Sequence, residues 1–141
     1  MKTLRVILGA IAGVTIAVGF AVFAEDRWAK SYPAPADLDW SDAAAVQRFM
    51  ESLTIGAMLW LVAGWIGATF IGALIGSTFA RARAPLVSKI VGGFMLAASS
   101  ANFLLTPHPS WVIAATILGI VAVTWFAKML MFKQGMVVSS A

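Results

Sequence analysis

Long apolar runs alternate with short polar segments along the 141 residues of this chain. The runs cover about residues 4–24, 53–79, 86–105 and 111–131. An α-helix needs about 20 apolar residues to cross the hydrocarbon core of a bilayer, and each run approaches or exceeds that length. The pattern therefore predicts a single all-α integral membrane domain with four transmembrane helices.

The first run follows Lys2 and Arg5, as a signal peptide would, and Val22 and Ala24 precede the polar segment in a small-residue cleavage context. The run is longer than the apolar core of a signal peptide, which spans roughly 7–15 residues. We therefore expect it to be retained as the first transmembrane helix.

The polar segment of about residues 25–52 contains every acidic residue of the chain: Glu25, Asp26, Asp37, Asp39, Asp42 and Glu51. Pro33 and Pro35 each fix φ and bias the preceding residue toward extended backbone, which predicts an ordered, non-helical arm from Glu25 to Trp40. Ser41 is a good helix N-cap, and apolar residues follow it at helical spacing. These are Val46, Phe49, Met50 and Leu53. The segment should therefore end in a short amphipathic helix that caps the outer face.

The aromatic residues of this cap are Trp28, Tyr32 and Trp40. Tryptophan and tyrosine are enriched at membrane–water interfaces, so we interpret them as interfacial anchors. A ligand-binding cage is the alternative interpretation.

Small residues recur at every fourth position of the first two runs. The first run contains Gly9, Gly13 and Ala17, and the second contains Gly64, Ala68, Gly72 and Gly76. Small side chains at this spacing let two helix backbones approach closely in lipid. We predict that the two helices pack along these positions.

Candidate chemistry at membrane depth is sparse. Ser99, Ser100 and Asn102 are the most polar positions of the third run, where they either bond across a helix interface or line a polar cavity. Trp60 and Trp65 lie in the second run, but no predicted span contains a histidine that could ligate haem, so we expect no cofactor.

The only histidine, His108, lies in the Pro107-His108-Pro109 turn, followed closely by Trp111. It can approach Glu25 and Asp26 if the first and third helices are neighbours. A histidine beside carboxylates can bind a metal, move protons or simply hold two loops together. Because one histidine without a ligand-spacing motif is a weak metal or catalytic signal, we predict a structural contact, with no catalytic or metal site.

Composition and charge agree with the membrane interpretation. The chain is 61% hydrophobic and 11% charged, its mean hydropathy is +0.91, and it has no cysteine. The net charge of +4 comes from basic residues scattered at the ends of apolar runs, which excludes a nucleic-acid-binding face. Seven of them fall on one predicted side: Lys2, Arg5, Arg81, Arg83, Lys89, Lys128 and Lys133. The positive-inside rule then places both termini in the cytoplasm and the cap outside.

Several short motifs occur in a recognisable order. Glu25 follows the first run, Tyr32-Pro33-Ala34-Pro35 follows it, a glycine-rich span comes next, and Asn102-Phe103 leads to Pro107-His108-Pro109-Ser110-Trp111. This order resembles that of a group of small, uncharacterised bacterial four-span inner-membrane proteins. The resemblance covers most of the chain. It implies a bacterial cytoplasmic membrane, and it implies no activity or substrate.

These observations favour a non-enzymatic membrane component: an accessory, assembly or structural subunit of a membrane complex or homo-oligomer. Its expected partners are the lipid bilayer and other membrane subunits or a second copy, and not nucleic acid. The alternative is a small-solute transporter or channel in which Asn102, Ser99, Ser100 and the acidic cap line an entry path. A lipid- or quinone-facing enzyme using His108 and Glu25 ranks last, since no nucleophile or ligand set accompanies them.

Overall fold

The computed structural model describes residues 2–80 and 83–138, and residues 132–138 are described by their backbone alone. Every regular element in these ranges is a helix, and the order along the chain is α1 (Lys2–Ser31), α2 (Ala43–Ser52), α3 (Ile55–Ala80), α4 (Ala84–Leu105) and α5 (Ser110–Val138). Four stretches are long and apolar enough to cross a membrane: α1, α3, α4 and residues Ser110–Met131 of α5. The prediction of an all-α, multi-pass membrane protein is confirmed at this level.

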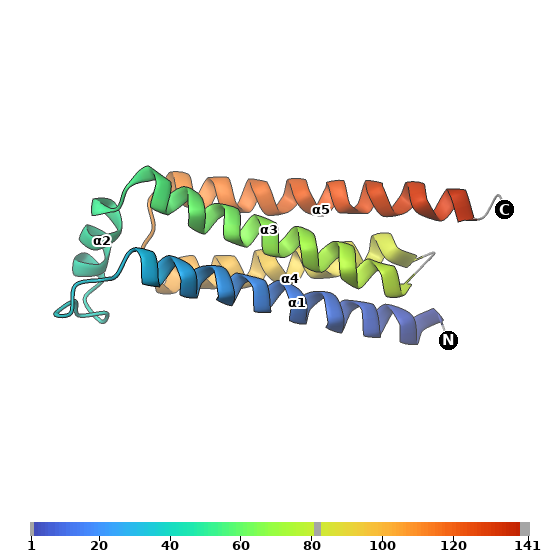
Figure 1. The fold of residues 1–141 in the computed structure, drawn as a ribbon, viewed down its shortest axis with the longest axis horizontal. Coiled ribbons are helices and arrows are strands. Elements are labelled where there is room, and N and C mark those ends of the chain that lie inside the picture. Colours follow the sequence, from blue (N-terminus) through green and yellow to red (C-terminus); the bar gives the residue numbers. More distant parts are fainter. Residues whose placement is uncertain (1, 81–82, 139–141) are drawn as a thin grey trace.

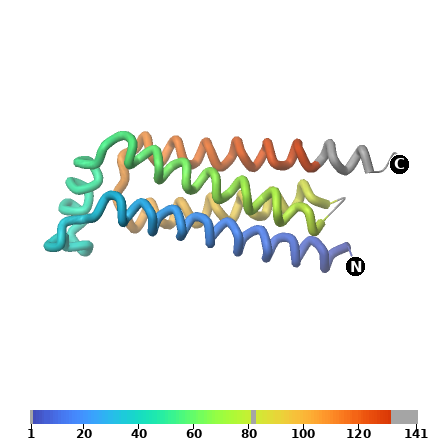
Figure 2. The backbone as a smooth tube through the Cα atoms, viewed as in Figure 1, coloured from blue at the N-terminus to red at the C-terminus, as the bar shows by residue number. Residues whose placement is uncertain are grey.

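The four long helices lie side by side as an up-and-down bundle, and α2 lies across one end (Figure 1). Helix α3 contacts α1, α4 and α5, and its contact with α1 is the most extensive in the bundle. The tube in Figure 2 shows that α1 begins at the end of the bundle opposite α2, where α3 ends and α4 begins. The structure therefore has a capped end, formed by α2 and the adjoining loops, and an open end. Of the basic residues assigned to the cytoplasmic side, Arg81 and the side chain of Lys133 lie outside the described residues.

Helices α1 and α3 are in close contact at glycine residues of both helices. A Cβ atom added at Gly76 would lie 2.5 Å from the Gly9 carbonyl oxygen and 2.8 Å from the Gly13 Cα atom. A Cβ atom added at Gly72 would lie 2.6 Å from the Ala17 Cβ atom. At Gly76 the two backbones thus touch directly, and no side chain larger than hydrogen fits there, while at Gly72 the only room is taken by the Ala17 methyl group.

The same interface continues toward the capped end with slightly larger residues. Ala68 is buried at 2% exposure, and a Cβ atom added at Gly64 would lie 2.9 Å from the Ala24 Cβ atom. Helix α1 therefore stays close to α3 along most of its length, which positions Glu25, the residue after Ala24, against α3.

Helix α1 is longer than the hydrophobic pattern predicts. The expectation of a non-helical arm from Glu25 was wrong for residues 25–31, which continue the helix to Ser31. Helical hydrogen bonds do not require apolar side chains, and the exposed Asp26–Lys30 ion pair of 2.7 Å has the i, i+4 spacing that supports a helix. The helix ends immediately before Tyr32, whose α conformation is disfavoured by Pro33.

Helix α2 is capped by Asp42 and not by Ser41 as expected. The Asp42 carboxylate accepts the Ala44 backbone N–H at 2.9 Å, whereas Ser41 donates its own N–H and hydroxyl to Asp39. Helix α2 buries Val46 and Met50 in a cluster with residues of α3 and α5, namely Met58, Val62 and Val112. This cluster fastens α2 to the end of the bundle.

Candidate functional site

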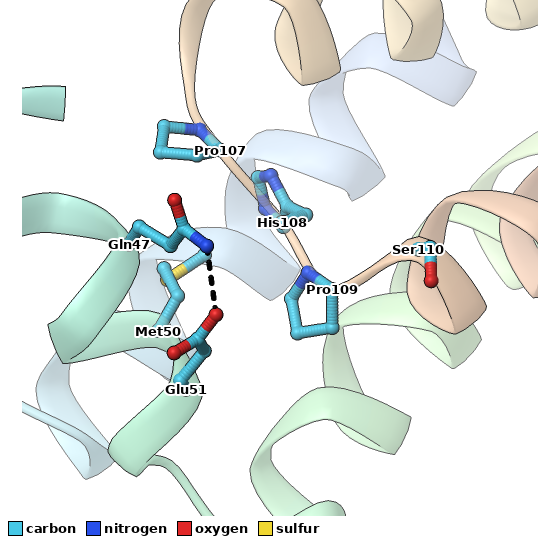
Figure 3. A pocket seen from close by; sticks show the side chains of 7 residues that line it. All are labelled: Gln47, Met50, Glu51, Pro107, His108, Pro109 and Ser110. Atoms are coloured by element: carbon cyan, nitrogen blue, oxygen red, sulfur yellow. Dashed lines mark hydrogen bonds between the residues drawn. The ribbon is translucent and has the colours of Figure 1, made fainter. Parts of the chain in front are cut away.

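Two clefts lie at the capped end of the bundle. The first, the Glu25 cleft, has a volume of about 180 Å³ and is lined by Glu25, Trp28, Ala29, Trp40, Met50, Leu61, Asn102, Thr106 and His108. The second, the Glu51 cleft, has a volume of about 340 Å³ and is lined by Gln47, Met50, Glu51, Pro107, His108, Pro109 and Ser110. Figure 3 shows the Glu51 cleft, with α2 on one side and the His108 turn on the other. Polar groups far apart in the sequence thus converge where α2 covers the bundle.

Glu25 is half-buried near the end of α1, and its position is set by a tryptophan of α3. The Trp65 indole Nε1–H donates a hydrogen bond to Glu25 Oε1 at 2.9 Å. Trp65 is 8% exposed, and this bond gives its indole N–H an acceptor inside the protein. The bond also holds one carboxylate oxygen while the carboxylate lines the cleft.

Trp28 and Trp40 contribute two indole rings to the Glu25 cleft. Trp28 Nε1–H donates to the Ala57 carbonyl oxygen at 2.9 Å, which ties the end of α1 to the start of α3. Trp40 is 63% exposed and lies edge-on to Phe49 of α2, with ring centroids 6.5 Å apart. One ring is therefore fixed by the bundle, and the other is carried by the loop before α2.

His108 is half-buried and lines both clefts. Its Nδ1 lies 2.7 Å from the Thr106 carbonyl oxygen, which can only accept, so Nδ1 carries the proton and Nε2 is left as an acceptor. The ring also meets Phe103 edge-on at a centroid distance of 5.1 Å. Burial lowers the pKa of His108 below its ordinary value of 6.5, partly opposed by the bond to Thr106, so the imidazole is neutral at pH 7.

The structure brings together only some of the residues expected to meet at the cap. Glu25 and His108 line the same cleft, but each has its described hydrogen bond with another partner, Trp65 or Thr106. Asp26 pairs instead with Lys30 and does not line the cleft. Tyr32 packs on Trp28 with ring centroids 6.1 Å apart. The remaining cap residues are exposed: Pro33, Pro35 and Trp111.

The polar residues of α4 point in different directions. Ser99 is buried and donates its hydroxyl to the Leu96 carbonyl oxygen at 3.1 Å, whereas Ser100 is exposed on the outside of the bundle. Asn102 alone of the three lines the Glu25 cleft. Because successive residues of a helix are rotated by about 100°, Ser100 lies on a different face from Asn102, whereas Ser99 lies about 60° from Asn102 and is buried in the bundle.

The sequence reasoning missed Gln47, Glu51 and Thr106 as lining residues and missed the bond between Trp65 and Glu25. A signal for that bond was present. In an antiparallel pair, the register that sets Ala17 against Gly72 brings Glu25 opposite Gly64, the residue before Trp65. A buried indole N–H needs an acceptor, and Glu25 is the carboxylate at that level.

The lining groups define what the capped end can do chemically. Among the described residues, no group of three or more histidine, cysteine, aspartate or glutamate side chains is placed to hold a metal ion. The Glu25 cleft offers an anionic oxygen, two indole rings and neutral hydrogen-bonding groups. The Glu51 cleft offers a second carboxylate, whose Oε1 accepts from Gln47 Nε2 at 2.8 Å (Figure 3). Such groups suit binding of a ligand or of a partner's side chains.

Acidification is expected to destabilise the capped end through His108. Because the folded chain holds His108 at a lowered pKa, it binds fewer protons than the unfolded chain below about pH 6.5, so stability present above that pH is lost as the pH falls. The free energy of unfolding should change with pH by well below about 1.4 kcal/mol per pH unit, which is the limit for one proton. The change is smaller because solvent screens a half-buried ring. Glu25 and Glu51 are the other titratable groups lining the two clefts.

The measurement is the free energy of unfolding in detergent between pH 7.5 and 5.5, for the native protein and for His108→Gln. The variant should show a flatter pH dependence over this range. An identical slope in the two proteins would show that another group is responsible.

No protein-family model, curated protein or solved structure matches this chain. The function proposed below therefore rests on the clefts, the helix contacts and the distribution of charge.

Proposed function

We propose that this protein is a non-enzymatic membrane component, an accessory, assembly or structural subunit, and that its capped end receives the partner. The observation that carries the proposal is that the helix faces suited to packing are already occupied, whereas the clefts at the capped end are open. The glycine faces of α1 and α3 are already in contact within the chain, so they are not free to bind another helix. The clefts that carry carboxylate, amide and imidazole groups lie instead around α2 and the His108 turn.

The orientation in the membrane follows from charge. Lys2, Arg5 and Arg83 lie at the open end, at the start of α1 or α4, and all acidic residues lie at or near the capped end. The positive-inside rule favours the open end, with both termini, on the cytoplasmic side. On this arrangement α2 is the short amphipathic helix on the periplasmic side of a bacterial inner membrane, and the partner approaches from there.

An apolar surface adjoins the capped end. Leu104 and Leu105, the last residues of α4, are 88% and 85% exposed. In a bilayer these side chains contact lipid or the helix of a neighbouring subunit. A partner that combines a periplasmic segment with a transmembrane helix, or a second copy of this chain, matches both surfaces.

Site-specific photo-crosslinking in native membranes tests the proposal. A photoreactive residue at Gln47 on α2 should give a reproducible adduct, identified by mass spectrometry after purification of the full-length protein. The control position is Thr78, which is exposed near the open end of α3. Equal adducts at the two positions, or a purified monomer without adduct, would refute a partner-binding capped end.

A small-solute transporter or channel is the second candidate, and the position of Asn102 in the Glu25 cleft favours it. Ser99 and Ser100 count against it, because Ser99 bonds to the backbone of its own helix, Ser100 is exposed, and neither lines the cleft with Asn102. Solute flux into proteoliposomes that is abolished by Asn102→Leu, with the helical fold retained, would select this function over the first.

A further inference from the structure

The described side chains that line the Glu25 cleft include a carboxyl group and no cationic group. Glu25 contributes a carboxylate, and no lysine or arginine is among the described side chains that line the cleft. The basic residues of the same helix end are engaged elsewhere: Lys30 pairs with Asp26, and the Arg27 guanidinium lies 5.2 Å from the centroid of the Phe23 ring. His108, the only other titratable lining group, is neutral at pH 7. No basic side chain among the described residues therefore pairs with the Glu25 carboxyl group inside the cleft.

The carboxylate lies in the same cleft as two indole rings. The face of an indole attracts cations more strongly than any other side-chain ring, and ammonium groups are commonly bound between such rings. Trp28 has its N–H committed to Ala57, so its contribution to the cleft is ring surface. Trp40 comes from a different segment and supplies a second ring.

The remaining lining groups suit the rim of an ammonium site. Asn102, Thr106 and His108 each present a neutral group with an acceptor atom: an amide oxygen, a hydroxyl oxygen and, on the imidazole, Nε2. The volume of about 180 Å³ is below the range of about 300–1,000 Å³ typical of sites for drug-sized ligands. It suits one small head group.

The depth of the cleft restricts where the cation can come from. Glu25 directly follows the apolar run of α1, so the cleft lies at the level of the membrane interface. Both a lipid headgroup and a free amine reach that level.

We propose that the Glu25 cleft binds an organic ammonium ion, a primary or quaternary amine carried by a lipid headgroup or by a free small molecule. The second oxygen of Glu25 pairs with the cation while Trp65 holds the first, and Trp28 and Trp40 flank it. The site lies in one of the two clefts of the capped end, but cation binding needs no protein partner, so the experiments below test it separately from partner binding.

Calorimetric titration of the full-length protein in a maltoside detergent tests the charge requirement. Choline is the cationic probe, and 3,3-dimethylbutan-1-ol, which has the same shape without the charge, is its control. Choline should bind at least about tenfold more tightly than the neutral compound, because a cation–π and carboxylate site has little attraction for an uncharged group. Equal binding of the two compounds would overturn the proposal.

Two pairs of variants locate the site. Glu25→Gln should weaken choline binding by about tenfold or more, while Asp26→Asn, which removes the adjacent carboxylate outside the cleft, should leave it unchanged. Trp40→Leu should also weaken binding several-fold, and Trp60→Leu, at an exposed position of α3 outside the cleft, should not. Because the exposed Trp40 is not needed for the bundle core, its variant tests the site even if Glu25→Gln fails to fold. Unchanged binding in Trp40→Leu, or equal losses in Asp26→Asn and Glu25→Gln, would refute the assignment.

Native mass spectrometry distinguishes the two sources of the cation. The protein is reconstituted in nanodiscs containing equal amounts of phosphatidylethanolamine and phosphatidylglycerol and then released. Selective retention of phosphatidylethanolamine that is lost in Glu25→Gln identifies a lipid headgroup as the ligand. Choline binding in detergent without selective lipid retention identifies a free amine. The absence of both would overturn the proposal.

Discussion

We expect Gly76→Ala to lower the free energy of unfolding by about 2–3 kcal/mol. The added methyl group would lie 2.5 Å from the Gly9 carbonyl oxygen and 2.8 Å from the Gly13 Cα atom. Both neighbours are backbone atoms, which cannot move aside by a change of rotamer. The overlap is relieved only if α1 and α3 separate, and that would loosen the most extensive helix contact in the bundle.

Gly67→Ala is the matched control on the same helix, because nothing lies within 4 Å of a Cβ atom added there. Its stability should stay the same or rise slightly, since glycine is a poorer helix former than alanine. Reversible unfolding in mixed micelles, followed by circular dichroism, measures both variants. Equal losses at the two positions would show that backbone contact with α1 is not what Gly76 provides.

Trp65→Ala is expected to be still more damaging, at about 3–5 kcal/mol. Trp65 is 8% exposed and belongs to the main core cluster, so truncation leaves a large void beside α1. It also removes the hydrogen bond to Glu25. The same assay should show a much smaller loss for Trp60→Ala, because that ring is 45% exposed. A comparable loss at Trp60 would contradict the assignment of Trp65 to the core.

Trp65→Phe distinguishes the contribution of the hydrogen bond to stability from the contribution of the buried ring. We expect it to cost about 1–3 kcal/mol, chiefly because Glu25 is left without its indole donor. In a double-mutant cycle with Glu25→Met, which removes the acceptor oxygen, the two effects should be non-additive, as for residues in direct contact. Additive effects would mean that the bond contributes nothing to stability.

The spans could be predicted from the sequence because a bilayer demands a minimum length of apolar helix, and that demand is visible as uninterrupted apolar runs. The ends of the helices could not be predicted in the same way. Hydropathy reports where α1 leaves the hydrocarbon region, near Ala24, whereas the helix itself stops only at Ser31, where proline intervenes. Ser41 and Asp42 are both good capping residues, and only the backbone geometry at Asp42 decides between them.

The candidate site was predicted in part. The cap residues Glu25 and His108 were identified as potential neighbours, and they line one cleft. Asn102 also lines this cleft, but Ser99 and Ser100 do not. This difference depends on the rotation of α4 about its axis, because each residue advances the side-chain direction by about 100°. A run of polar residues in the sequence does not specify that rotation.

The sequence by itself determined that this is a multi-pass helical membrane protein with its acidic residues gathered at one end. Apolar length and charge position are properties of each segment, and they are readable without knowing which segments meet. Only the tertiary structure decided that Glu25 lies against Trp65 and that two indole rings share its cleft. Those contacts depend on the register in which the glycine faces of α1 and α3 interlock, and on the way Val46 and Met50 seat α2 over the bundle.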